Sequence, residues 1–407
     1  MSSEVEPSAP FRLRPLILTV YLPTFLIALG QGAVLPVLPL LAKDLGAGIG
    51  MAGLVFAMRG IGTMVFDVPA GVAASRFGDR RTLLIGAGAI AIVSIGSGAS
   101  TSVLQLAVFT FLYGAGNAVF QIARLAYIAE VAPTHQRGRV IALMGGTNRI
   151  ATFAGPIAGG LLAKGFGLPA AFAFQAGAAG AAALIIFFTV IGGRDAWIAP
   201  ERGVYARVGA TLREHRRSFL TWGLAVITLQ VIRGGRQILV PLWGDHIGLD
   251  VAAIGLAVGF SSAIDMLLFY PVGVAMDRWG RKYVAVPSLV VLSLGLALIP
   301  LTRSFEMLML VGVLTGLGSG LGTGIVMTLG ADLSPQIGRG EFLGVWRLVG
   351  DVGTAGGPVV IGAIAGALTL GAASLVAAAI GLVGAVFMLA TARETLARSH
   401  EPAARPP

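Results

Sequence analysis

Residues 251–282 read VAAIGLAVGFSSAIDMLLFYPVGVAMDRWGRK, an apolar run with one charged residue, Asp265, that ends in a short basic turn. The hydrocarbon core of a bilayer is about 30 Å thick and a helix rises about 1.5 Å per residue, so about 20 apolar residues cross it. Residues 251–276 are therefore long enough to span a membrane as a helix. The same arrangement, an apolar run followed by a glycine-containing basic turn, occurs at residues 51–81.

The rest of the chain follows this pattern. Hydrophobic residues make up 56% of the 407 residues and charged residues 12%, with a mean hydropathy of +0.86, which excludes an ordinary soluble enzyme. Cutting the sequence at charged or turn-forming clusters gives apolar segments at residues 16–41, 51–74, 82–99, 104–131, 140–163, 169–191, 218–243, 251–276, 283–301, 307–333, 342–368 and 371–391. We therefore expect an all-α membrane protein with twelve transmembrane helices.

The distribution of the formal charge of +10 predicts the topology and argues against nucleic-acid binding. Of the 29 basic residues, 20 fall on the side shared by both termini, three on the other side (Lys43, Lys164 and Arg303) and six inside spans. Cytoplasmic loops of membrane proteins are enriched in Lys and Arg, so both termini are expected in the cytoplasm, with the protein in the cytoplasmic membrane. The polar, acidic start of the chain does not read as a cleavable signal.

An internal repeat divides the chain. At an offset of 202 residues, and without gaps, Pro69 aligns with Pro271, and Glu130 aligns with Asp332. Two halves of equal topology, related by an axis along the membrane normal, support alternating access around a site between them. We expect two pseudo-symmetric six-helix bundles. The expected boundaries are an N-terminal bundle at 1–191, a cytoplasmic linker at 192–217, a C-terminal bundle at 218–395 and a tail at 396–407.

The expected linker is rich in arginine, with Arg194, Arg202, Arg207, Arg213, Arg216 and Arg217. Such a cluster between two spans is expected to fix the topology of the chain. Contact with anionic lipid headgroups is the alternative reading.

The loops after spans two and eight resemble motif A of the major facilitator superfamily. The second copy runs Gly273-Val-Ala-Met-Asp277-Arg278-Trp-Gly280-Arg281-Lys282, and the first runs Gly71-Val-Ala-Ala-Ser75-Arg76-Phe-Gly78-Asp79-Arg80-Arg81. The resemblance covers residues 12–395 and implies two bundles of six helices and a secondary transporter. It also implies that Arg76 pairs with Glu130 and Arg278 with Asp332 to form a cytoplasmic gate. Ser75 stands where the family usually has Asp, so constitutive loop anchoring is an equal reading of the first copy.

Two further stretches favour export. Residues 29–39 in the first span resemble twelve-helix drug and metabolite exporters, and Gly155-Pro156-Ile-Ala-Gly159-Gly160 in span five resembles the end of the antiporter motif. The match is partial, since Ala142 and Ala151 take the places of the motif's earlier glycines, and Thr110 takes the place of an arginine usual in span four.

Polar residues recur at helical spacing in four spans. In this family, helices one, four, seven and ten line the central cavity, and these are the spans that carry the stripes. We expect the cavity to be lined by Gln31, Tyr113, Asn117, Gln121, Gln230, Arg233, Arg236, Gln237, Thr315, Ser319 and Thr323. Ordinary hydrogen bonding between helices is the alternative explanation.

The spans also contain charged residues, namely Arg59, Arg124, Arg149, Arg233, Arg236 and Arg347, with Asp67, Asp265 and Asp351. Each would cost several kcal/mol facing lipid, so each is expected to face protein or water and to be paired. Depth and spacing predict three pairs, which are Asp67 with Arg124, Asp265 with Arg233, and Arg347 with Asp351. The excess of arginine favours an anionic substrate, while Asp265 and Asp351 leave a cationic or zwitterionic one open.

Proton coupling needs a buried carboxylate, because the four histidines lie in loops or the tail. Asp67, Asp265 and Asp351 are the available carriers, of which Asp351 and Asp265 are preferred, with a static salt bridge as the alternative for each. The chain has no cysteine, no phosphate-binding loop and no metal-ligand cluster, so we expect no cofactor, no metal and no enzymatic activity.

The expected function is proton-coupled export of a small organic molecule by a monomeric transporter. Import or facilitated passage of an organic anion is the first alternative. A receptor or scaffold that moves nothing is the alternative from another class.

Overall fold

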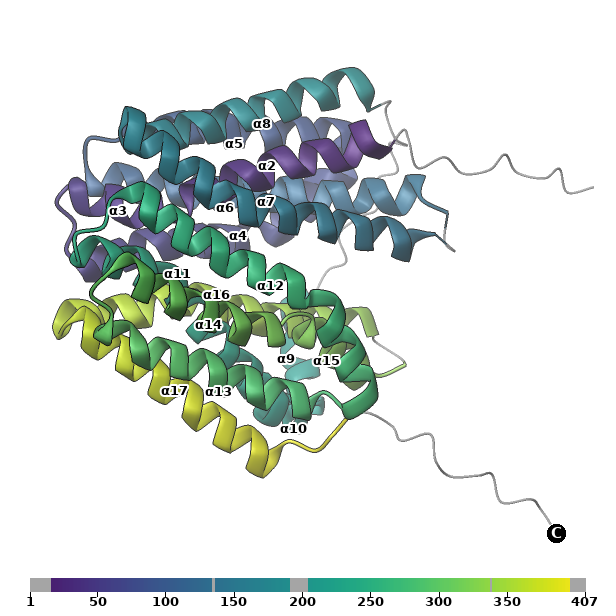
Figure 1. The fold of residues 1–407 in the computed structure, drawn as a ribbon. Coiled ribbons are helices and arrows are strands. Elements are labelled where there is room, and N and C mark those ends of the chain that lie inside the picture. Colours follow the sequence, from purple (N-terminus) through teal and green to yellow (C-terminus); the bar gives the residue numbers. More distant parts are fainter. Residues whose placement is uncertain (1–15, 134–135, 191–203, 337–338, 396–407) are drawn as a thin grey trace, which may run out of the picture.

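The computed structural model describes residues 16–133, 136–190, 204–336 and 339–395, and these residues are helical apart from turns and short connections. Residues 1–15, the first part of the expected linker with Arg194 and Arg202, and the whole expected tail at 396–407 lie outside the described residues. The long helices run lengthwise in two groups, with α2–α8 in one and α11–α17 in the other (Figure 1). Both expected classes, all-α and membrane-spanning, are confirmed.

Each predicted span coincides with a helix or with helices in series. In the first half these are η1 (Ile17–Tyr21), α2 (Leu22–Val34) and α3 (Val37–Asp44), then α4 (Ile49–Phe77), α5 (Asp79–Gly98), α6 (Val103–Val131), α7 (Arg137–Phe166) and α8 (Pro169–Thr189). In the second half they are α10 (Arg216–Ser218), η2 (Phe219–Gly223) and α11 (Leu224–His246), α12 (Val251–Trp279), α13 (Lys282–Leu298) with η3 (Ile299–Leu301), α14 (Phe305–Leu321) with α15 (Ile325–Leu333), α16 (Arg339–Ala367) and α17 (Leu370–Thr391).

Within the described residues, ten helical segments are long and apolar enough to cross a membrane by composition. The helices α7 and α11 complete the set of twelve, and neither is among those ten. Both contain arginines and other polar residues in their middle turns, which lowers their apolar character. A helix of this kind is expected to face protein or water rather than lipid.

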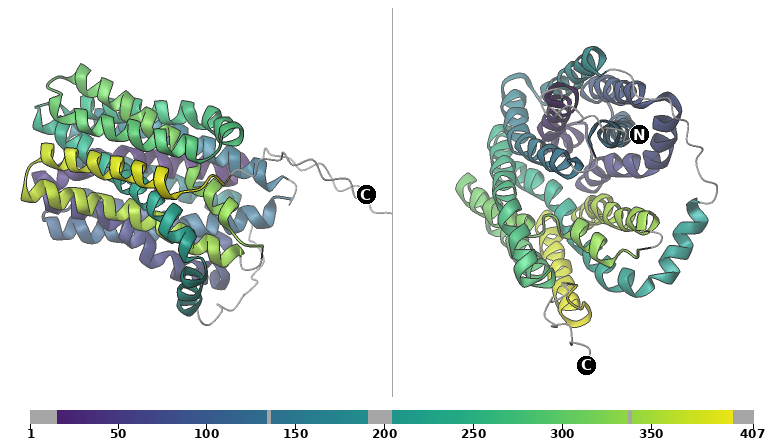
Figure 2. Two further views of the ribbon diagram at one scale, coloured as in Figure 1. Left: turned by 90° about the horizontal axis from the view of Figure 1, so that it is seen from below. Right: turned by 90° about the vertical axis from the view of Figure 1, so that its right-hand side faces the viewer.

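The expected linker contains a helix that the sequence did not predict, α9 (Val204–Glu214). Thr211 on α9 is buried, and the ring of the following His215 lies 5.2 Å from the ring of Phe342 on α16. The end of the linker region therefore packs on the second half. In the end-on view of Figure 2 this segment lies outside the ring of long helices.

The two ends of the molecule differ in charge. The basic end is where α4 and α12 finish and carries Arg76, Arg80, Arg278 and Arg281. At the opposite, far end, helices begin with side-chain caps, for example where Ser102 accepts the backbone N–H of Gln105 and Asp250 accepts that of Ala253.

The repeat is visible in the packing. A Cβ on Gly116 would lie 3.4 Å from the backbone nitrogen of Ile90, and one on its partner Gly318, 202 residues later, would lie still closer, at 2.3 Å, to the backbone nitrogen of Leu292, the equivalent of Ile90. Small residues let membrane helices approach closely, which increases van der Waals contact. The same close approach is thus built twice.

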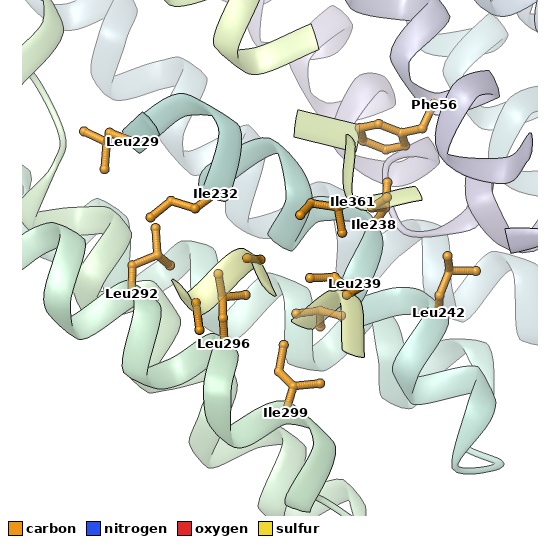
Figure 3. Packing of buried hydrophobic residues seen from close by; sticks show 14 of the residues in the cluster. Phe56, Leu229, Ile232, Ile238, Leu239, Leu242, Leu292, Leu296, Ile299 and Ile361 are labelled. Atoms are coloured by element: carbon orange, nitrogen blue, oxygen red, sulfur yellow. The ribbon is translucent and has the colours of Figure 1, made fainter. Parts of the chain in front are cut away.

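The largest apolar core lies in the second half and reaches across to the first. Figure 3 shows Leu229 and Ile232 of α11 near Leu292 and Leu296 of α13, all buried. Phe56 of α4 belongs to the same buried cluster. This continuity joins the two halves.

Candidate functional site

A cavity of about 660 Å³ lies between the two halves. In the first half it is lined mainly by α7, through Met144, Asn148, Arg149 and Thr152 among others, and in the second by α11, α12 and the α14–α15 region. A volume of this size suits a small organic molecule. Its walls carry both polar and apolar side chains.

Close helix packing seals the cavity at the far end. A Cβ on Gly160 of α7 would lie 2.7 Å from the carbonyl oxygen of Val251 on α12. The two halves meet along two seams, one between α7 and α12 and the other between α4 and α16. On the second seam, a Cβ on Gly53 of α4 would lie 2.6 Å from the carbonyl oxygen of Pro358 on α16. Nothing larger than glycine fits at either place without movement of a helix.

The basic end is open by contrast. Ideal Cβ atoms on Gly145 and Gly146 of α7 and on Gly344 of α16 meet nothing within 4 Å. Met327, which lines the cavity, is 83% exposed. The halves therefore meet at the far end and separate toward the basic end.

Two ion pairs reinforce the far-end seal. Lys43 pairs with Asp245, and these residues occupy the same position in the two repeats. Lys164 at the end of α7 lies 2.8 Å from Asp250, the N-cap of α12. Both pairs join the first half to the second, so each must break if the far end opens.

The second of these ion pairs predicts a pH dependence. The hydrogen bond from Lys164 holds the pKa of Asp250 below its usual value of 3.8. A carboxylate with a lowered folded-state pKa stabilises the closed seal above its unfolded pKa and loses this contribution as the pH falls through the folded value. We expect the melting temperature of the purified wild-type protein to fall as the pH drops below about 4, because Asp250 is then protonated. The Lys164→Ala variant should lack this part of the pH dependence. Equal pH profiles for the two proteins would contradict this assignment.

An arginine–aspartate cluster occupies the middle of the cavity. Arg149 Nη1 of α7 lies 3.4 Å from Asp265 Oδ1, and Arg233 Nη2 of α11 lies 3.6 Å from Asp265 Oδ2. Ser319 and Thr323 donate to the same carboxylate at 2.9 and 2.7 Å. The predicted pair of Asp265 and Arg233 is confirmed, and the contact with Arg149, which crosses from one half to the other, was not predicted.

A second charged cluster lies on the other seam between the halves. Arg347 of α16 lies 3.6 Å from Asp351, as predicted, and 3.9 Å from Asp67 of α4. Asp67 Oδ1 is buried and accepts no hydrogen bond among the described residues. Two carboxylates therefore share one guanidinium here.

The predicted pair of Asp67 with Arg124 is wrong. Arg124 donates instead to Gln121 on its own helix and to Thr24 of α2, at 3.4 Å for the latter. Depth in the membrane placed Asp67 and Arg124 at the same level but did not show which way each helix face points. Arg59, the other charged residue predicted within this span, is half-buried and lies over the Phe56 ring at 5.6 Å.

The predicted cavity residues divide into three groups. Those that line the cavity are Gln230, Arg233, Arg236, Gln237, Ser319 and Thr323. Gln31 and Tyr113 line a separate cavity of about 20 Å³ inside the first half, together with Arg59. Asn117, Gln121 and Thr315 are in neither lining, and Thr315 is fully buried with its hydroxyl on the carbonyl of Gly312.

The contributions of α7 and α12 to the cavity lining were not predicted from the sequence. Asn148 and Thr152 of α7 and Ser261 and Ser262 of α12 line the cavity but belong to no predicted stripe. The signal was present for α7, since Asn148, Arg149 and Thr152 lie within one turn of a helix too polar to face lipid.

The antiporter-like glycines serve helix packing. A Cβ on Gly155 would lie 2.7 Å from the Cα of Gly32 on α2, and one on Gly159 would lie 2.0 Å from the carbonyl oxygen of Ala33. Pro156 follows in the same turn, and its carbonyl oxygen lies against Gly255 of α12. The motif thus sets the approach of α7 both to α2 and across the seam to α12.

The second motif A copy joins helix ends within the second half. Arg281 Nε lies 2.7 Å from Asp332, and Asp277 lies 3.6 Å from Arg281. The predicted pair of Arg278 with Asp332 is therefore wrong, because Arg281, beyond the turn, takes that position while Arg278 is exposed. Gly280 has a φ of 108°, and a Cβ there would lie 2.5 Å from the Glu394 carboxylate, which accepts the backbone N–H groups of Arg281 and Lys282. Gly273 meets nothing within 4 Å.

The first copy makes an equivalent anchor. Arg80 donates to the carbonyl of Phe187 at 2.7 Å, and its repeat partner Lys282 donates to the carbonyl of Leu389, which is the partner of Phe187, at 2.7 Å. Gly78 ends α4 with a φ of 76°. Gly71 meets nothing within 4 Å, and Arg76 is exposed over the ring of Phe77, so its pairing with Glu130 stays a prediction.

Comparison with known proteins agrees with this architecture. The family model of the Major Facilitator Superfamily matches residues 20–235 and 231–407. Multidrug resistance protein MdtH of Klebsiella pneumoniae is 26% identical over 353 residues, covering 82% of this chain and 83% of that protein. Multidrug resistance protein MdtG of Salmonella typhimurium is 25% identical over 395 residues, covering 94% and 97%. The crystal structure of the nucleoside transporter NupG, 16% identical, has a TM-score of 0.78 and covers 93% of this chain and 100% of that one.

Proposed function

The chain belongs to the major facilitator superfamily of secondary transporters, and we propose that it exports a small organic molecule from the cytoplasm in exchange for protons. The observation that carries this proposal is the cavity between the halves, which is open at one end and sealed at the other by contacts that both halves supply. An access path of this kind, with a pseudo-symmetric seam, is what alternating access requires.

The orientation in the membrane and the direction of transport are each supported by one observation. The basic end is the open end, and cytoplasmic loops are the ones enriched in Lys and Arg. We therefore propose that the protein lies in the cytoplasmic membrane and that its open end faces the cytoplasm. The related proteins MdtH and MdtG are named multidrug resistance proteins, which supports export rather than uptake.

We assign the proton to the carboxylates that flank Arg347. Asp265, the other candidate, has both oxygens engaged by hydroxyls and guanidinium groups, so it is held as an acceptor. Asp67 and Asp351 share one arginine, which leaves one negative charge without a cation of its own. A proton on this pair balances the charge, and closely interacting carboxylates titrate as a unit. Because Asp67 and Arg347 belong to different halves, a proton there also changes a contact between the halves.

The gating and antiporter-like motifs have supporting roles in this proposal. The anchors made by Arg80, Arg281 and Lys282 keep each half rigid, and Gly160 lets the far end close. Rigid halves that rock about a fixed site are the expected form of motion in this family. The site needs no cofactor for such motion, because the gradient supplies the energy.

The test uses purified protein in vesicles with an acidic interior, a neutral exterior and an internal pH dye. An exchanger takes up organic substrate from outside and releases protons, so the interior should become alkaline when a substrate is added. Protein-free vesicles are the control for passive leakage of weak bases. Uptake of labelled substrate without proton release would contradict exchange, and further acidification would show symport.

Import of an organic anion is the second candidate function. It is favoured by the arginines around Asp265, which attract anions irrespective of direction. Net uptake of the anion together with protons in the same vesicles would favour this candidate.

A further inference from the structure

The described residues that line the cavity carry an excess of positive charge. Arg149, Arg233 and Arg236 face the cavity, and Asp265 is the one acid among the lining residues. Cavities with low-dielectric walls concentrate ions of opposite charge. The lining therefore favours an anion over a cation of the same shape.

Asp265 cannot serve a cationic ligand without losing its present partners. Oδ1 accepts from Thr323 at 2.7 Å and lies 3.4 Å from Arg149, while Oδ2 accepts from Ser319 at 2.9 Å and lies 3.6 Å from Arg233. Two hydroxyls and two guanidinium groups thus hold one carboxylate. A cation that displaced them would leave the half-buried Arg149 and Arg233 without a counter-charge, which is unfavourable.

Two of the three arginines keep donors for a ligand. A guanidinium has five N–H donors. Arg236 donates to the neutral hydroxyl of Ser261 at 2.6 Å, and Arg149 reaches Asp265 only at 3.4 Å, a long contact for a charged pair. Arg149 also lies 4.1 Å from the centre of the Phe269 ring, which fixes its plane.

Apolar side chains lie next to these donors. Met144 of α7, Val258 and Phe269 of α12, and Val326 and Met327 of α15 line the same cavity. Methionine adapts its shape to varied partners, and an aromatic ring offers a flat contact surface. The lining thus combines a charged point with an apolar wall.

We infer that the cavity binds an amphipathic organic anion, with its carboxylate or sulfonate on Arg149 and Arg236 and its apolar body against Phe269 and the neighbouring methionines. The inference rests on the proposed transport function for its biological meaning. The anion competes with Asp265 for Arg149, and these two residues lie on opposite halves. Binding therefore replaces the contact between Arg149 and Asp265, which joins the halves, by a contact between Arg149 and the ligand. A bound ligand thus weakens one of the contacts between the halves.

The test compares three probes with one apolar body: naphthoate, naphthamide and naphthylmethylammonium. Equilibrium dialysis with purified full-length protein in detergent gives the affinity of each. We expect naphthoate to bind about tenfold or more tightly than naphthamide, since hydrogen bonds between charged groups are about twice as strong as neutral ones. Naphthylmethylammonium should bind more weakly than the amide.

Arginine variants locate the anion. Arg149→Gln and Arg236→Gln should each lower naphthoate affinity more than naphthamide affinity, so that the ratio of the two falls toward one, and retained naphthamide binding shows that the variants are folded. Arg149→Lys should retain part of the preference. Arg303→Gln, at an exposed position of the far end, is the matched control and should behave as wild type. Equal affinities for the anion and the amide, a preference for the cation, or wild-type naphthoate binding by both Gln variants would each overturn the inference.

These outcomes are separate from those of the transport test. A protein that binds naphthoate through Arg149 and Arg236 but moves no solute would keep this inference and refute the proposed function. A protein that exports organic cations with proton release, and does not bind naphthoate, would keep the proposed function and refute this inference.

Discussion

Replacing Asp351 by Asn is expected to abolish substrate-driven proton release while substrate binding persists. The carboxylate shares Arg347 with Asp67, and without it Arg347 and Asp67 form a balanced pair that needs no proton. Asp67→Asn should have the same effect, because Asp351 and Arg347 then form the balanced pair. In the vesicle assay both variants should fall to the level of protein-free vesicles, because a neutral side chain at either position leaves one acid for one arginine.

The matched control is Asp44→Asn, which removes an exposed acid at the far end and should leave proton release unchanged. Retention of wild-type proton release by both Asp351→Asn and Asp67→Asn would place the coupling carboxylate elsewhere. Loss of substrate binding in both variants would make the pair a structural contact rather than a proton site.

Replacing Gly160 by Leu is expected to open the far end. The added Cβ would lie 2.7 Å from the carbonyl oxygen of Val251 and 3.1 Å from the Cα of Gly255, so α7 and α12 must separate. Overpacking a close contact costs about 1–3 kcal/mol, which shifts an equilibrium between two conformations by about 5- to 150-fold. The population should move away from the state seen in this structure.

Cysteine labelling measures this shift. The chain contains no cysteine, so a single Val240→Cys substitution, at a buried lining position, gives one reactive site. An impermeant maleimide added from the far side should modify it faster when Gly160 is Leu. Gly165→Leu on the same helix is the matched control, because a Cβ there meets nothing within 4 Å. Equal labelling in all three backgrounds would contradict the role of Gly160 in the seal.

The spans and the repeat were predictable because both are patterns along the chain and do not depend on which helices contact one another. Apolar runs of about 20 residues leave little alternative to membrane-spanning helices. The offset of 202 residues correctly related Arg80 to Lys282, and these two side chains make equivalent bonds. The helix α9 was missed because its short amphipathic pattern lies in a strongly charged segment with no apolar run.

The pairing of charges was predictable only where the partners are neighbours on one helix or on adjacent spans. Arg347 with Asp351 follows from helical spacing. Asp67 with Arg347, and Arg149 with Asp265, join different halves, and periodicity within one helix carries no information on which faces meet across the seam. Arg124 illustrates the limit, since its depth matched Asp67 but its side chain turns to Thr24.

The cavity lining likewise divides into residues that were predicted from the spacing on one helix and residues whose place depends on how the halves meet. The stripe on α11 was correctly placed at the cavity, as were Ser319 and Thr323 of the next stripe but not Thr315, since polar residues on one helix face must avoid lipid. The predicted stripe on α6 was not at the cavity. Asn117 and Gln121 lie outside its lining, and the first half contributes to the lining mainly through α7. Which helix of a half faces the cavity depends on how the halves tilt, and the tilt is set by contacts such as those of Gly160 and Gly53.

In the proposed transport cycle the two halves rock about the cavity, so that one end opens as the other closes. Spin labels test it directly, because the chain has no cysteine to remove. One pair, Arg139→Cys with Trp279→Cys, reports the basic end, and a second pair, Phe166→Cys with His246→Cys, reports the far end; all four positions are exposed. On lowering the pH or adding a transported substrate, the basic-end distance should shorten while the far-end distance lengthens. Distances that stay fixed, or that change in the same direction at both ends, would contradict alternating access and leave a rigid receptor or scaffold as the better account.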